Sequence, residues 1–328
     1  MTRIDLSATP GLLELLFTEG QLEELRSLGE LHLHLDPAHL ATELAGSTLD
    51  VVVTTWATPP VREWTGGRAP KLLAHTGGTV RPLFGDDGVP AGCFVVQASA
   101  AMADGVAELA LAMCLVLLRR LHTFDRALHG AEGWSAVADV HGRELAHQRI
   151  GIVGASRTGR AFIRMLAGVG ALKIRVYDPY LTMAEAARLG VGKSDLIELL
   201  EWTDVLVLHA PVTPETTGMI GPDEFALLRD GAVVVNTARA ALMDEAALVA
   251  EARSGRLHFG LDVFHHEPLP VNSPLLALNN VYIAPHRGAA TVEARHQQGQ
   301  IVLDEIARFQ KGHPLHHPVT PELYHQLS

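Results

Sequence analysis

Residues 149–159 read RIGIVGASRTG, and this stretch decides the fold that the sequence predicts. A short apolar run passes through a glycine-rich turn into a helical pattern over residues 158–169. The turn follows G-x-G-x-x-G at Gly154 and Gly159, but Ser156 stands where the pattern has its middle glycine. Such a turn directs a helix N-terminus at a phosphate group, which predicts pyrophosphate binding by Gly154, Ser156, Arg157, Thr158 and Gly159.

An acid at the end of the next apolar run supports this interpretation. The run at residues 172–177 is followed by Asp178, which lies 24 positions (178 − 154) after Gly154. A carboxylate there hydrogen-bonds the ribose hydroxyls of NAD and repels the 2′-phosphate of NADP. The sequence thus predicts NAD as cofactor. The alternative is a strand-to-helix turn without a ligand, beside a surface Asp.

Further apolar runs alternate with helical patterns on both sides of this stretch. Six runs are expected to be strands, at residues 149–153, 172–177, 204–208, 232–236, 258–263 and 281–284. Weaker runs precede them at residues 50–54, 72–75 and 94–97. Continuous apolar strands separated by helices indicate parallel sheets covered on both faces. We expect an α/β protein of two doubly wound parallel-sheet domains.

The division of the chain follows from the helices at either end of the middle region. Residues 103–121 are apolar almost all round a helix, and residues 291–310 form a long amphipathic one. If the second helix returns to the first domain, a Rossmann NAD-binding domain (114–290) is inserted into a smaller, flavodoxin-like substrate domain (1–113 and 291–328). A chain of 328 residues suits two domains.

The composition of the chain limits the kinds of binding partner and the cellular location that can be expected. The formal net charge of −11 disfavours nucleic acid and anionic membranes. The apolar run at residues 106–118 is expected to be too short to span a membrane, and no signal peptide is recognised. Two apolar-flanked cysteines, Cys93 and Cys114, fit a reducing cytoplasm. The histidine-rich residues 313–318 are interrupted by Pro and are expected to be a solvated tail, so no metal is predicted.

Three chemically distinct side chains follow three of the expected strands. Arg239 comes after residues 232–236, Glu267 after residues 258–263, and His286 after residues 281–284. Parallel sheets bind ligands beyond the carboxyl ends of their strands. A guanidinium clamps a carboxylate, an imidazole moves a proton, and a neighbouring carboxylate orients the imidazole and favours its charged form. Taken singly, each residue is as well explained by a surface ion pair or a loop histidine; together they predict hydride-transfer chemistry on a 2-hydroxy acid.

With these motifs, residues 106–290 resemble the D-isomer-specific 2-hydroxyacid dehydrogenase family. The strings that carry the resemblance are VAE (106–108), LHAPVTPET (208–216), NTAR (236–239), LDVF (261–264), Glu267-Pro268 and PHRG (285–288). The resemblance implies Arg239 as substrate clamp, His286 as acid/base and Glu267 as its partner. It also implies cofactor contacts from a larger group of residues: His209, Ala210, Pro211, Thr216, Thr237, Ala238, Asp262 and Gly288.

The resemblance extends loosely to the first hundred residues. It implies a substrate-binding loop at residues 75–81, where Gly77, Gly78 and Arg81 are the expected contacts. It implies a homodimer joined through the cofactor domain. The sequence departs from the family at Ser156, expected to narrow the space for the pyrophosphate, and at Ala240, which replaces a Gly after the clamp.

Two questions about activity stay open at this stage. An NAD(H)-sensing corepressor or scaffold on the same fold is an alternative to a dehydrogenase. Formate oxidation is disfavoured because the resemblance implies Gln, not Glu267, in enzymes for formate. A small polar 2-oxo acid such as glyoxylate or hydroxypyruvate is the expected substrate, unless Trp56, Trp64 and Phe84 fold inward to receive an apolar side chain.

Overall fold

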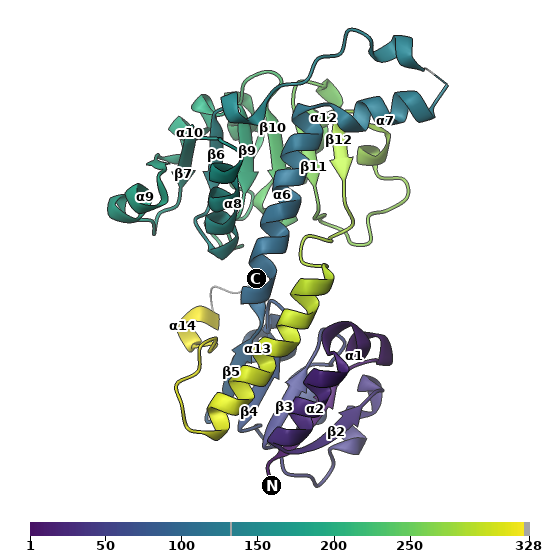
Figure 1. The fold of residues 1–328 in the computed structure, drawn as a ribbon, viewed down its shortest axis with the longest axis vertical. Coiled ribbons are helices and arrows are strands. Elements are labelled where there is room, and N and C mark those ends of the chain that lie inside the picture. Colours follow the sequence, from purple (N-terminus) through teal and green to yellow (C-terminus); the bar gives the residue numbers. More distant parts are fainter. Residues whose placement is uncertain (132, 325–328) are drawn as a thin grey trace. The chain divides into compact units, whose positions relative to one another are not determined.

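The computed structural model describes residues 1–131 and 133–324. The chain forms two compact units, one of Met1–Met102 with Ala289–Ser328 and one of Ala103–Gly288 (Figure 1). Each unit is built on an all-parallel sheet, which confirms the predicted fold class. The expected domain limit after residue 113 falls inside helix α6 (Ala103–Leu118), all of which belongs to the second unit.

The second unit contains a seven-stranded sheet in the order β12-β11-β10-β9-β6-β7-β8. Its strands are β6 (Ile150–Val153), β7 (Ile174–Tyr177), β8 (Gly192–Lys193), β9 (Val205–Leu208), β10 (Val233–Asn236), β11 (His258–Leu261) and β12 (Val281–Ile283). Its helices are α6, α7 (Leu121–His129), α8 (Arg157–Gly168), α9 (Met183–Leu189), α10 (Leu196–Trp202), α11 (Pro222–Leu227) and α12 (Glu245–Ser254). All six expected strands are present; β8 was missed because two exposed residues carry no apolar signal.

Alternate side chains of these strands pack into two separate cores, one on each face of the sheet. Val205 and Val207 face α6 and α8, whereas Leu206 and Leu208 face α10, α11 and α12. Both sets are fully buried, as expected for a parallel sheet covered by helices on both sides. The strand order reverses between β6 and β9, and ligands bind such sheets at this switch point, beyond the carboxyl ends of the strands.

The first unit contains a five-stranded sheet in the flavodoxin-like order β2-β1-β3-β4-β5. Its strands are β1 (Arg3–Ser7), β2 (Glu30–His34), β3 (Val51–Thr54), β4 (Leu72–His75) and β5 (Phe94–Gln97). Its helices are α1 (Pro10–Leu16), α2 (Glu19–Leu28), α3 (Leu40–Glu43), α4 (Val61–Trp64), α5 (Arg81–Phe84), α13 (Val292–Gln310) and α14 (Pro321–Tyr324). Helix α13 packs against α1 and α2 through Val302, Leu303 and Ile306, so the return of the chain to this unit is confirmed.

The histidine-rich segment near the C-terminus is not the solvated tail that we expected. The backbone of Gln97 donates to the carbonyl of His317, and Val319 donates to Val95, so the segment pairs with the edge of β5. Buried Glu305 on α13 accepts the amides of His316 and His317. A carboxylate that would otherwise be buried without partners thus fixes the segment. Within the described residues, no group of three or more His, Cys, Asp or Glu side chains is arranged to hold a metal ion.

The apolar helix is longer than the sequence analysis expected. Residues Ser99–Leu118 form one helical stretch of 20 residues that would suffice, by length and composition alone, to cross a membrane. One side of α6 is buried in the core of the second unit, where Met113 and Leu117 pack near Gly260 of β11. A core helix has this composition as well, so the length of the apolar stretch does not distinguish the two. The pattern breaks at Arg120, whose φ of 58° ends the helix before α7 begins.

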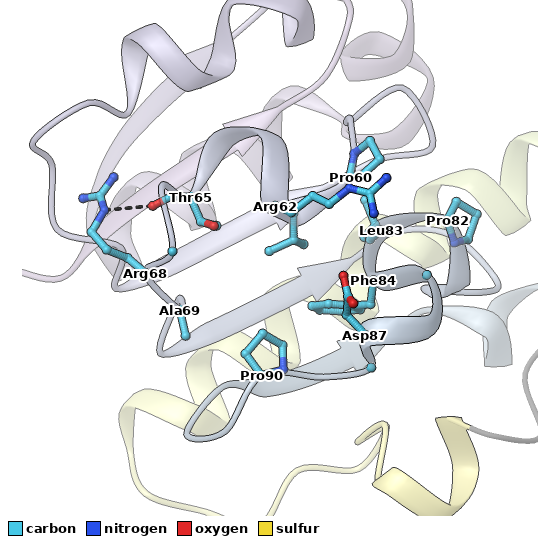
Figure 2. A pocket seen from close by; sticks show the side chains of 14 residues that line it. Pro60, Arg62, Thr65, Arg68, Ala69, Pro82, Leu83, Phe84, Asp87 and Pro90 are labelled. Carbon is cyan, nitrogen blue, oxygen red and sulfur yellow. Dashed lines mark hydrogen bonds between the residues drawn. The ribbon is translucent and has the colours of Figure 1, made fainter.

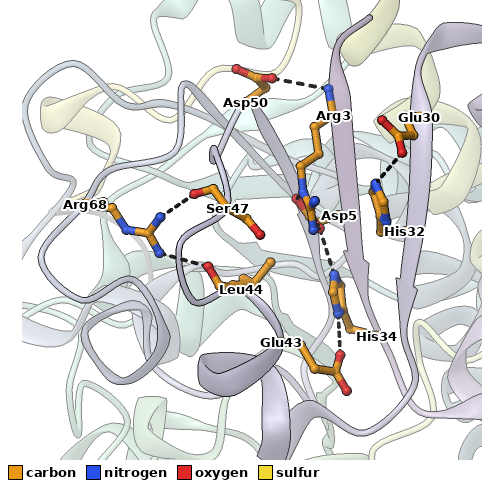
Figure 3. Close-up of polar contacts among 10 residues, drawn as sticks. All are labelled: Arg3, Asp5, Glu30, His32, His34, Glu43, Leu44, Ser47, Asp50 and Arg68. Atoms are coloured by element: carbon orange, nitrogen blue, oxygen red, sulfur yellow. Dashed lines mark hydrogen bonds and ion pairs between the residues drawn. The ribbon is translucent and has the colours of Figure 1, made fainter.

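A buried polar cluster joins β1, β2 and α3 in the first unit (Figure 3). His34 binds Asp5 through Nε2 at 2.8 Å and Glu43 through Nδ1. Arg3 adds a two-pronged contact to Asp5, which is fully buried. Since only an imidazolium can donate from both ring nitrogens, this geometry assigns a positive charge to His34. The hydrogen bond to Asp5 and a second to Glu43 raise the pKa of His34 against the opposing effect of burial.

The cluster predicts a pH-dependent stability of the first unit. Because the pKa of His34 is raised on folding, its contribution is complete below the ordinary value of 6.5 and is lost as pH rises through the folded value. Burial alone would raise the pKa of Asp5, but hydrogen bonds from His34 and Arg3 outweigh it and lower that pKa, so the contribution of Asp5 disappears in acid. We expect His34→Gln to destabilise the protein by about 3–5 kcal/mol at pH 6, the range for breaking a buried pair.

Urea unfolding of the full chain at pH 6 and pH 9 measures this effect. The gap between wild type and His34→Gln should shrink at pH 9, where the wild-type imidazole has lost its proton. His39→Gln is the matched control, since His39 pairs with Asp36 at the surface with 70% of its side chain exposed. A gap of equal size at both pH values would show that His34 is neutral in the folded protein.

Candidate functional site

The three predicted catalytic residues follow strands that end in register. Asn236 of β10 lies opposite Leu261 of β11, which in turn lies opposite Ile283 of β12. Arg239, Glu267 and His286 come after these strand ends, so the parallel sheet places all three at its carboxyl edge. The strand register thus brings the starts of the three loops that carry these residues to one edge of the sheet.

Glu267 and His286 form a direct pair. Nδ1 of His286 lies 2.7 Å from Oε2 of Glu267, and the other carboxylate oxygen accepts the amide of Phe264 at 3.0 Å. The imidazole is thus held by a carboxylate that is itself anchored to the backbone. The His286 side chain is 50% exposed, and no described residue hydrogen-bonds its Nε2. This arrangement leaves Nε2 available to exchange a proton with a bound molecule.

Arg239 lies in a loop that Asn236 holds in place. The side chain of Asn236 donates to the carbonyl of Arg239 at 2.8 Å and accepts the amide of Ala238 at 3.0 Å. Burial lowers the pKa of the Arg239 guanidinium, and the charge of Glu267 opposes that shift. Among the described residues Arg239 forms no ion pair, and its guanidinium donates to the carbonyl of Ala238. A buried cation without a carboxylate partner is suited to an anionic ligand.

Asn236 had no role in the sequence analysis, although it was quoted as part of a motif. The available signal was a polar residue directly after a continuous apolar strand. Ala240, which replaces the glycine expected after Arg239, is the first residue of a short turn. Arg239, the residue before this turn, has its φ in the extended region. The turn forms without a glycine, so this departure does not disrupt the loop.

Asp262 fixes the turn that carries His286. Its two carboxylate oxygens accept the amides of Arg287 at 2.7 Å and Gly288 at 2.8 Å. Only 1% of Asp262 is exposed, and burial raises its pKa while the two amides oppose the shift. A Cβ on Gly288 would approach Asp262 to 3.1 Å, which explains a small residue there. His286 itself has a φ of 54°, so the turn holds it in the left-handed region.

The glycine-rich turn after β6 is closely packed against the end of β9. A Cβ on Gly154, whose φ is 98°, would lie 2.7 Å from the amide nitrogen of Ala210. A Cβ on Gly159 would lie 2.2 Å from the carbonyl oxygen of Gly154. Both glycines are therefore required by close backbone approach, at the switch point of the sheet. Arg157 and Thr158 are the first two residues of α8, so their amides belong to the helix N-terminus.

Ser156 is the N-cap of α8. Its hydroxyl accepts the amide of Gly159 at 3.3 Å and donates to the carbonyl of His209 at 3.0 Å. The side chain is thus engaged within the protein, which is a physical reason for serine at the position of the usual glycine. The sequence analysis considered only its bulk and missed the cap.

Asp178 lies beside this turn, where the ribose of a dinucleotide was expected. One oxygen accepts the amide of Ala155 at 2.7 Å, and the other accepts the amide of Tyr180 at 2.8 Å. The carboxylate is therefore oriented by two backbone groups. It is partly exposed, so lone pairs remain for ribose hydroxyls.

Two buried polar side chains near the turn have no hydrogen-bond partner among the described residues. They are His209, at the end of β9, where both ring nitrogens are unpaired, and Thr237 Oγ1, just after β10. Burial lowers the pKa of His209 to about 3, so the ring is neutral, and it packs on Phe162 at 5.2 Å. Buried polar atoms are almost always satisfied, and these two lie at the edge where a cofactor is expected. The residues present therefore fit a dinucleotide.

The segment that follows His209 forms a compact turn. Ala210 is 8% exposed and supplies the backbone against which Gly154 packs. The Thr216 hydroxyl accepts the amide of Thr213 at 2.7 Å and lies 2.7 Å from the carbonyl of Pro211. Ala238 contributes its amide to Asn236 as described above. These contacts give the predicted cofactor residues of this segment a defined conformation.

The expected substrate loop belongs to the first unit and follows β4. His75 is buried under it, and a Cβ on Gly77 would lie 2.3 Å from Nε2 of His75. Burial lowers the pKa of His75 to about 4, so a neutral ring supports the loop. Arg81 begins α5, lies 3.9 Å from Asp86 and packs over the ring of Tyr324 at 5.4 Å. Gly77 and Gly78 thus present backbone amides, while Arg81 already has an anionic neighbour.

A hollow in the first unit has none of the predicted substrate-binding residues, Gly77, Gly78 and Arg81, in its lining (Figure 2). It has a volume of about 330 Å³ between α4 and the loop before β5, with Leu83 and Phe84 among its lining residues. At one end, Arg68 Nε donates to the carbonyl of Thr65 at 3.0 Å. This hollow is separate from the loop at residues 76–79 and supplies no group to the chemistry described above.

A doubly wound sheet with a glycine turn at its switch point defines a dinucleotide-binding protein. The model of the family described as "D-isomer specific 2-hydroxyacid dehydrogenase, NAD binding domain" matches residues 111–288. The chain belongs to the D-isomer-specific 2-hydroxyacid dehydrogenase family. NAD is therefore its cofactor, and the family places it among the NAD-dependent oxidoreductases.

Proteins similar in sequence to this chain include D-3-phosphoglycerate dehydrogenases and glyoxylate reductases. The D-3-phosphoglycerate dehydrogenase of Mycobacterium leprae is 36% identical over 237 residues, covering 72% of this chain and 44% of that protein. The chain thus matches less than half the length of that relative. The glyoxylate reductase of Korarchaeum cryptofilum is 34% identical over 229 residues, covering 67% of each chain. A phosphoglycerate oxidoreductase from Rhizobium etli has a TM-score of 0.76 at 27% identity, covering 96% of this chain and 97% of that one.

The position of Asp178 predicts a preference for NADH over NADPH. Asp178→Asn keeps a backbone acceptor but removes the charge, so it should weaken NADH binding and relieve repulsion of the 2′-phosphate. Fluorescence titration measures the dissociation constants of both cofactors. We expect the dissociation constant for NADPH divided by that for NADH to fall at least about tenfold in the variant, the effect of one charge-assisted hydrogen bond. Glu201→Gln, at an exposed site, is the control for loss of one negative charge. An unchanged ratio would remove Asp178 from ribose recognition.

Proposed function

We propose that the protein interconverts a small 2-oxo acid and the corresponding D-2-hydroxy acid with NAD(H). The observation that carries the proposal is the Glu267–His286 pair at 2.7 Å, on the same sheet edge as the unpaired cation Arg239. The D configuration comes from the family. NAD(H), when bound, supplies or accepts the hydride at C2.

Arg239 is proposed to bind the substrate carboxylate. Its guanidinium is partly buried and lacks a carboxylate partner among the described residues, so a ligand carboxylate would satisfy it with charge-assisted hydrogen bonds. The brace from Asn236 keeps this loop in one conformation before substrate arrives. In the first unit, Gly77 and Gly78 are proposed as substrate-binding residues, as the family resemblance implies.

His286 is proposed to move the proton of the C2 oxygen. In reduction, Nε2 donates a proton as the carbonyl becomes an alkoxide, and in oxidation the neutral ring takes the hydroxyl proton. Glu267 holds Nδ1 and stabilises the charged ring, while its own contact with Phe264 fixes its position. Asp262 acts as a positioning residue, because it holds the amides that follow His286.

The proposed substrate is small and polar, such as glyoxylate or hydroxypyruvate. Trp64 and Phe84 are 2% and 6% exposed and belong to the core of the first unit, so neither is free to receive a large apolar side chain. Trp56 is exposed, but Arg295 packs over its ring at 4.5 Å. Arg81 lies next to Asp86, whose negative charge would weaken the attraction of Arg81 for the phosphate group of a phosphorylated substrate.

A cytoplasmic homodimer is proposed as the working form. Both cysteines, Cys93 and Cys114, are free thiols, as a reducing compartment favours. In the second unit, apolar residues of α6 and α7 remain exposed, among them Leu115, Leu121 and Leu128. A second copy of the chain is the occupant proposed for this apolar surface.

Replacement of His286 tests the acid/base role. Because His286 has a φ of 54°, Asn is the replacement that best tolerates its backbone conformation. We expect His286→Asn to lower kcat for 2-oxo acid reduction by about 10²–10⁴-fold. His266→Asn, an exposed neighbour, should retain the wild-type rate. A near-normal rate in His286→Asn would exclude the mechanism, and absence of turnover in the wild type with every 2-oxo acid would favour an NAD(H)-sensing protein.

Replacement of Glu267 tests the partner role through the pH profile. Glu267→Gln keeps the size of the side chain but removes the charge that stabilises an imidazolium at 2.7 Å. The alkaline limb of the pH–rate curve for reduction should move to lower pH, because the carboxylate charge beside the imidazole ring is gone. The measurement is kcat/KM against pH at saturating NADH. A limb that does not move would leave Glu267 with a structural role only.

A substrate panel tests the size and charge of the substrate. The structure leads us to expect kcat/KM to be highest for glyoxylate or hydroxypyruvate and lower for 2-oxoisocaproate and phenylpyruvate. The 3-phosphate of hydroxypyruvate belongs in the panel, since the similar proteins include D-3-phosphoglycerate dehydrogenases. NADH absorbance gives the rates. A clear preference for 2-oxoisocaproate or phenylpyruvate would overturn the small-substrate proposal.

A further inference from the structure

The opposite edge of the larger sheet carries a group of arginines. Strands β9, β10 and β11 begin in register at Val205, Val233 and His258. Five arginines lie in or next to the segments that lead into this amino-terminal edge: Arg120, Arg143, Arg149, Arg229 and Arg256. Three carboxylates form ion pairs with arginines there, namely Asp204, Asp230 and Glu251.

The three carboxylates are already paired with two of these arginines. Arg149 binds Asp204 with two side-chain hydrogen bonds, of 2.8 and 2.5 Å. Arg256 lies 3.0 Å from Glu251 and 3.6 Å from Asp230. Within residues 1–131 and 133–324, neither Arg120 nor Arg143 forms an ion pair. Arg229 also lacks an ion pair among the described residues, but it is exposed, so Arg120 and Arg143 are the partly buried guanidiniums of this edge without a carboxylate partner.

Arg120 and Arg143 are brought together by a close backbone contact. A Cβ on Gly142 would lie 2.9 Å from the Cα of Arg119, and the amide of Arg143 donates to the carbonyl of Leu118 at 2.8 Å. The guanidinium of Arg120 lies over His258, with Nη1 2.8 and 2.7 Å from the two ring nitrogens. Arg143 donates to the carbonyl of Gly231 at 2.5 Å. Uncharged groups are thus the partners of both guanidiniums.

The partly buried environment of Arg120 and Arg143 disfavours the charged form of both guanidiniums. Burial, followed by the charge of the other arginine, lowers the pKa of Arg120; burial also lowers the pKa of Arg143, and the charge of Asp204 opposes that shift. Burial and these two cations lower the pKa of His258 to about 4, so the ring is neutral. The C-terminus of α6 offers a partial negative charge of roughly half a unit, which is too small to balance two guanidiniums.

We propose that Arg120 and Arg143 form a binding site for a phosphate dianion, free or as the phosphoryl group of a small metabolite. Two guanidiniums offer forked donors that suit phosphate oxygens, and a dianion would balance their two charges. The site lies at the amino ends of the strands, opposite the edge that carries Asp178 and His286, and does not depend on the proposed catalytic function.

Inorganic phosphate is the probe for this site. It is titrated calorimetrically into the full chain at constant ionic strength, with saturating NADH to cover the glycine-rich turn. We expect one phosphate per chain for the wild type, and binding at least about tenfold weaker for Arg143→Gln and for Arg120→Asn. Asn is chosen at 120 because it tolerates the φ of 58° found there. Circular dichroism and urea unfolding verify that both variants are folded.

Arg119→Gln is the matched control, because it removes the same charge from an exposed neighbour with no ion pair among the described residues. It should bind phosphate as the wild type does. Arg143→Lys, which keeps the charge, should retain more affinity than Arg143→Gln. Equal affinity in all these proteins, or no binding by the wild type at millimolar phosphate, would overturn the proposal. So would a change of oligomeric state in Arg143→Gln without a change in phosphate affinity, since a second copy would then supply the anion.

Discussion

The close approach of Gly154 to the backbone of Ala210 is the constraint on which the larger unit depends. It brings the turn after β6 against the end of β9, at the point where the strand order reverses. Helix α8 can then start directly above the sheet edge, and the Ser156 hydroxyl can reach both Gly159 and His209. A side chain at either glycine would push the helix away. The cofactor site is therefore a consequence of backbone packing before any side chain contacts a ligand.

At the carboxyl edge that carries Arg239 and His286, polar side chains rather than glycines fix the loops. Asn236 and Asp262 each end a continuous apolar strand and turn back to bind the backbone of the loop that follows. These two buried side chains fix the loops that carry Arg239 and His286. Since buried polar groups cost free energy unless they are paired, each loop conformation is coupled to the folding of the sheet. The reactive side chains are thus positioned by residues that need not touch a substrate.

The sequence predicted the larger unit well and the smaller one less completely. Strands such as β9 and β10 are continuous apolar runs, so their pattern identifies them without knowledge of neighbours. Strands β1 and β2 escaped because Asp5 and His34 interrupt their apolar pattern, and the two are compatible with a core only as partners of one another. A single-residue pattern does not encode such pairs. The backbone pairing of residues 317–319 was missed for the same reason, because it depends on contacts distant in sequence. The cap at Ser156 is local, since it accepts the amide of Gly159, and a serine directly before a helix was the available signal.

The two edges of the larger sheet differ in which of their partly buried charged side chains have a partner of opposite charge. At the carboxyl edge, Glu267 balances His286, and Arg239 is left for a substrate carboxylate. At the amino edge, Asp204 and Glu251 neutralise Arg149 and Arg256, whereas Arg120 and Arg143 keep their charges. An isolated cation in a partly buried position raises the free energy of the folded state, so folding tolerates it only when other contacts compensate. The same physical argument that identifies Arg239 as a carboxylate clamp therefore identifies the Arg120–Arg143 pair as a site for an anion.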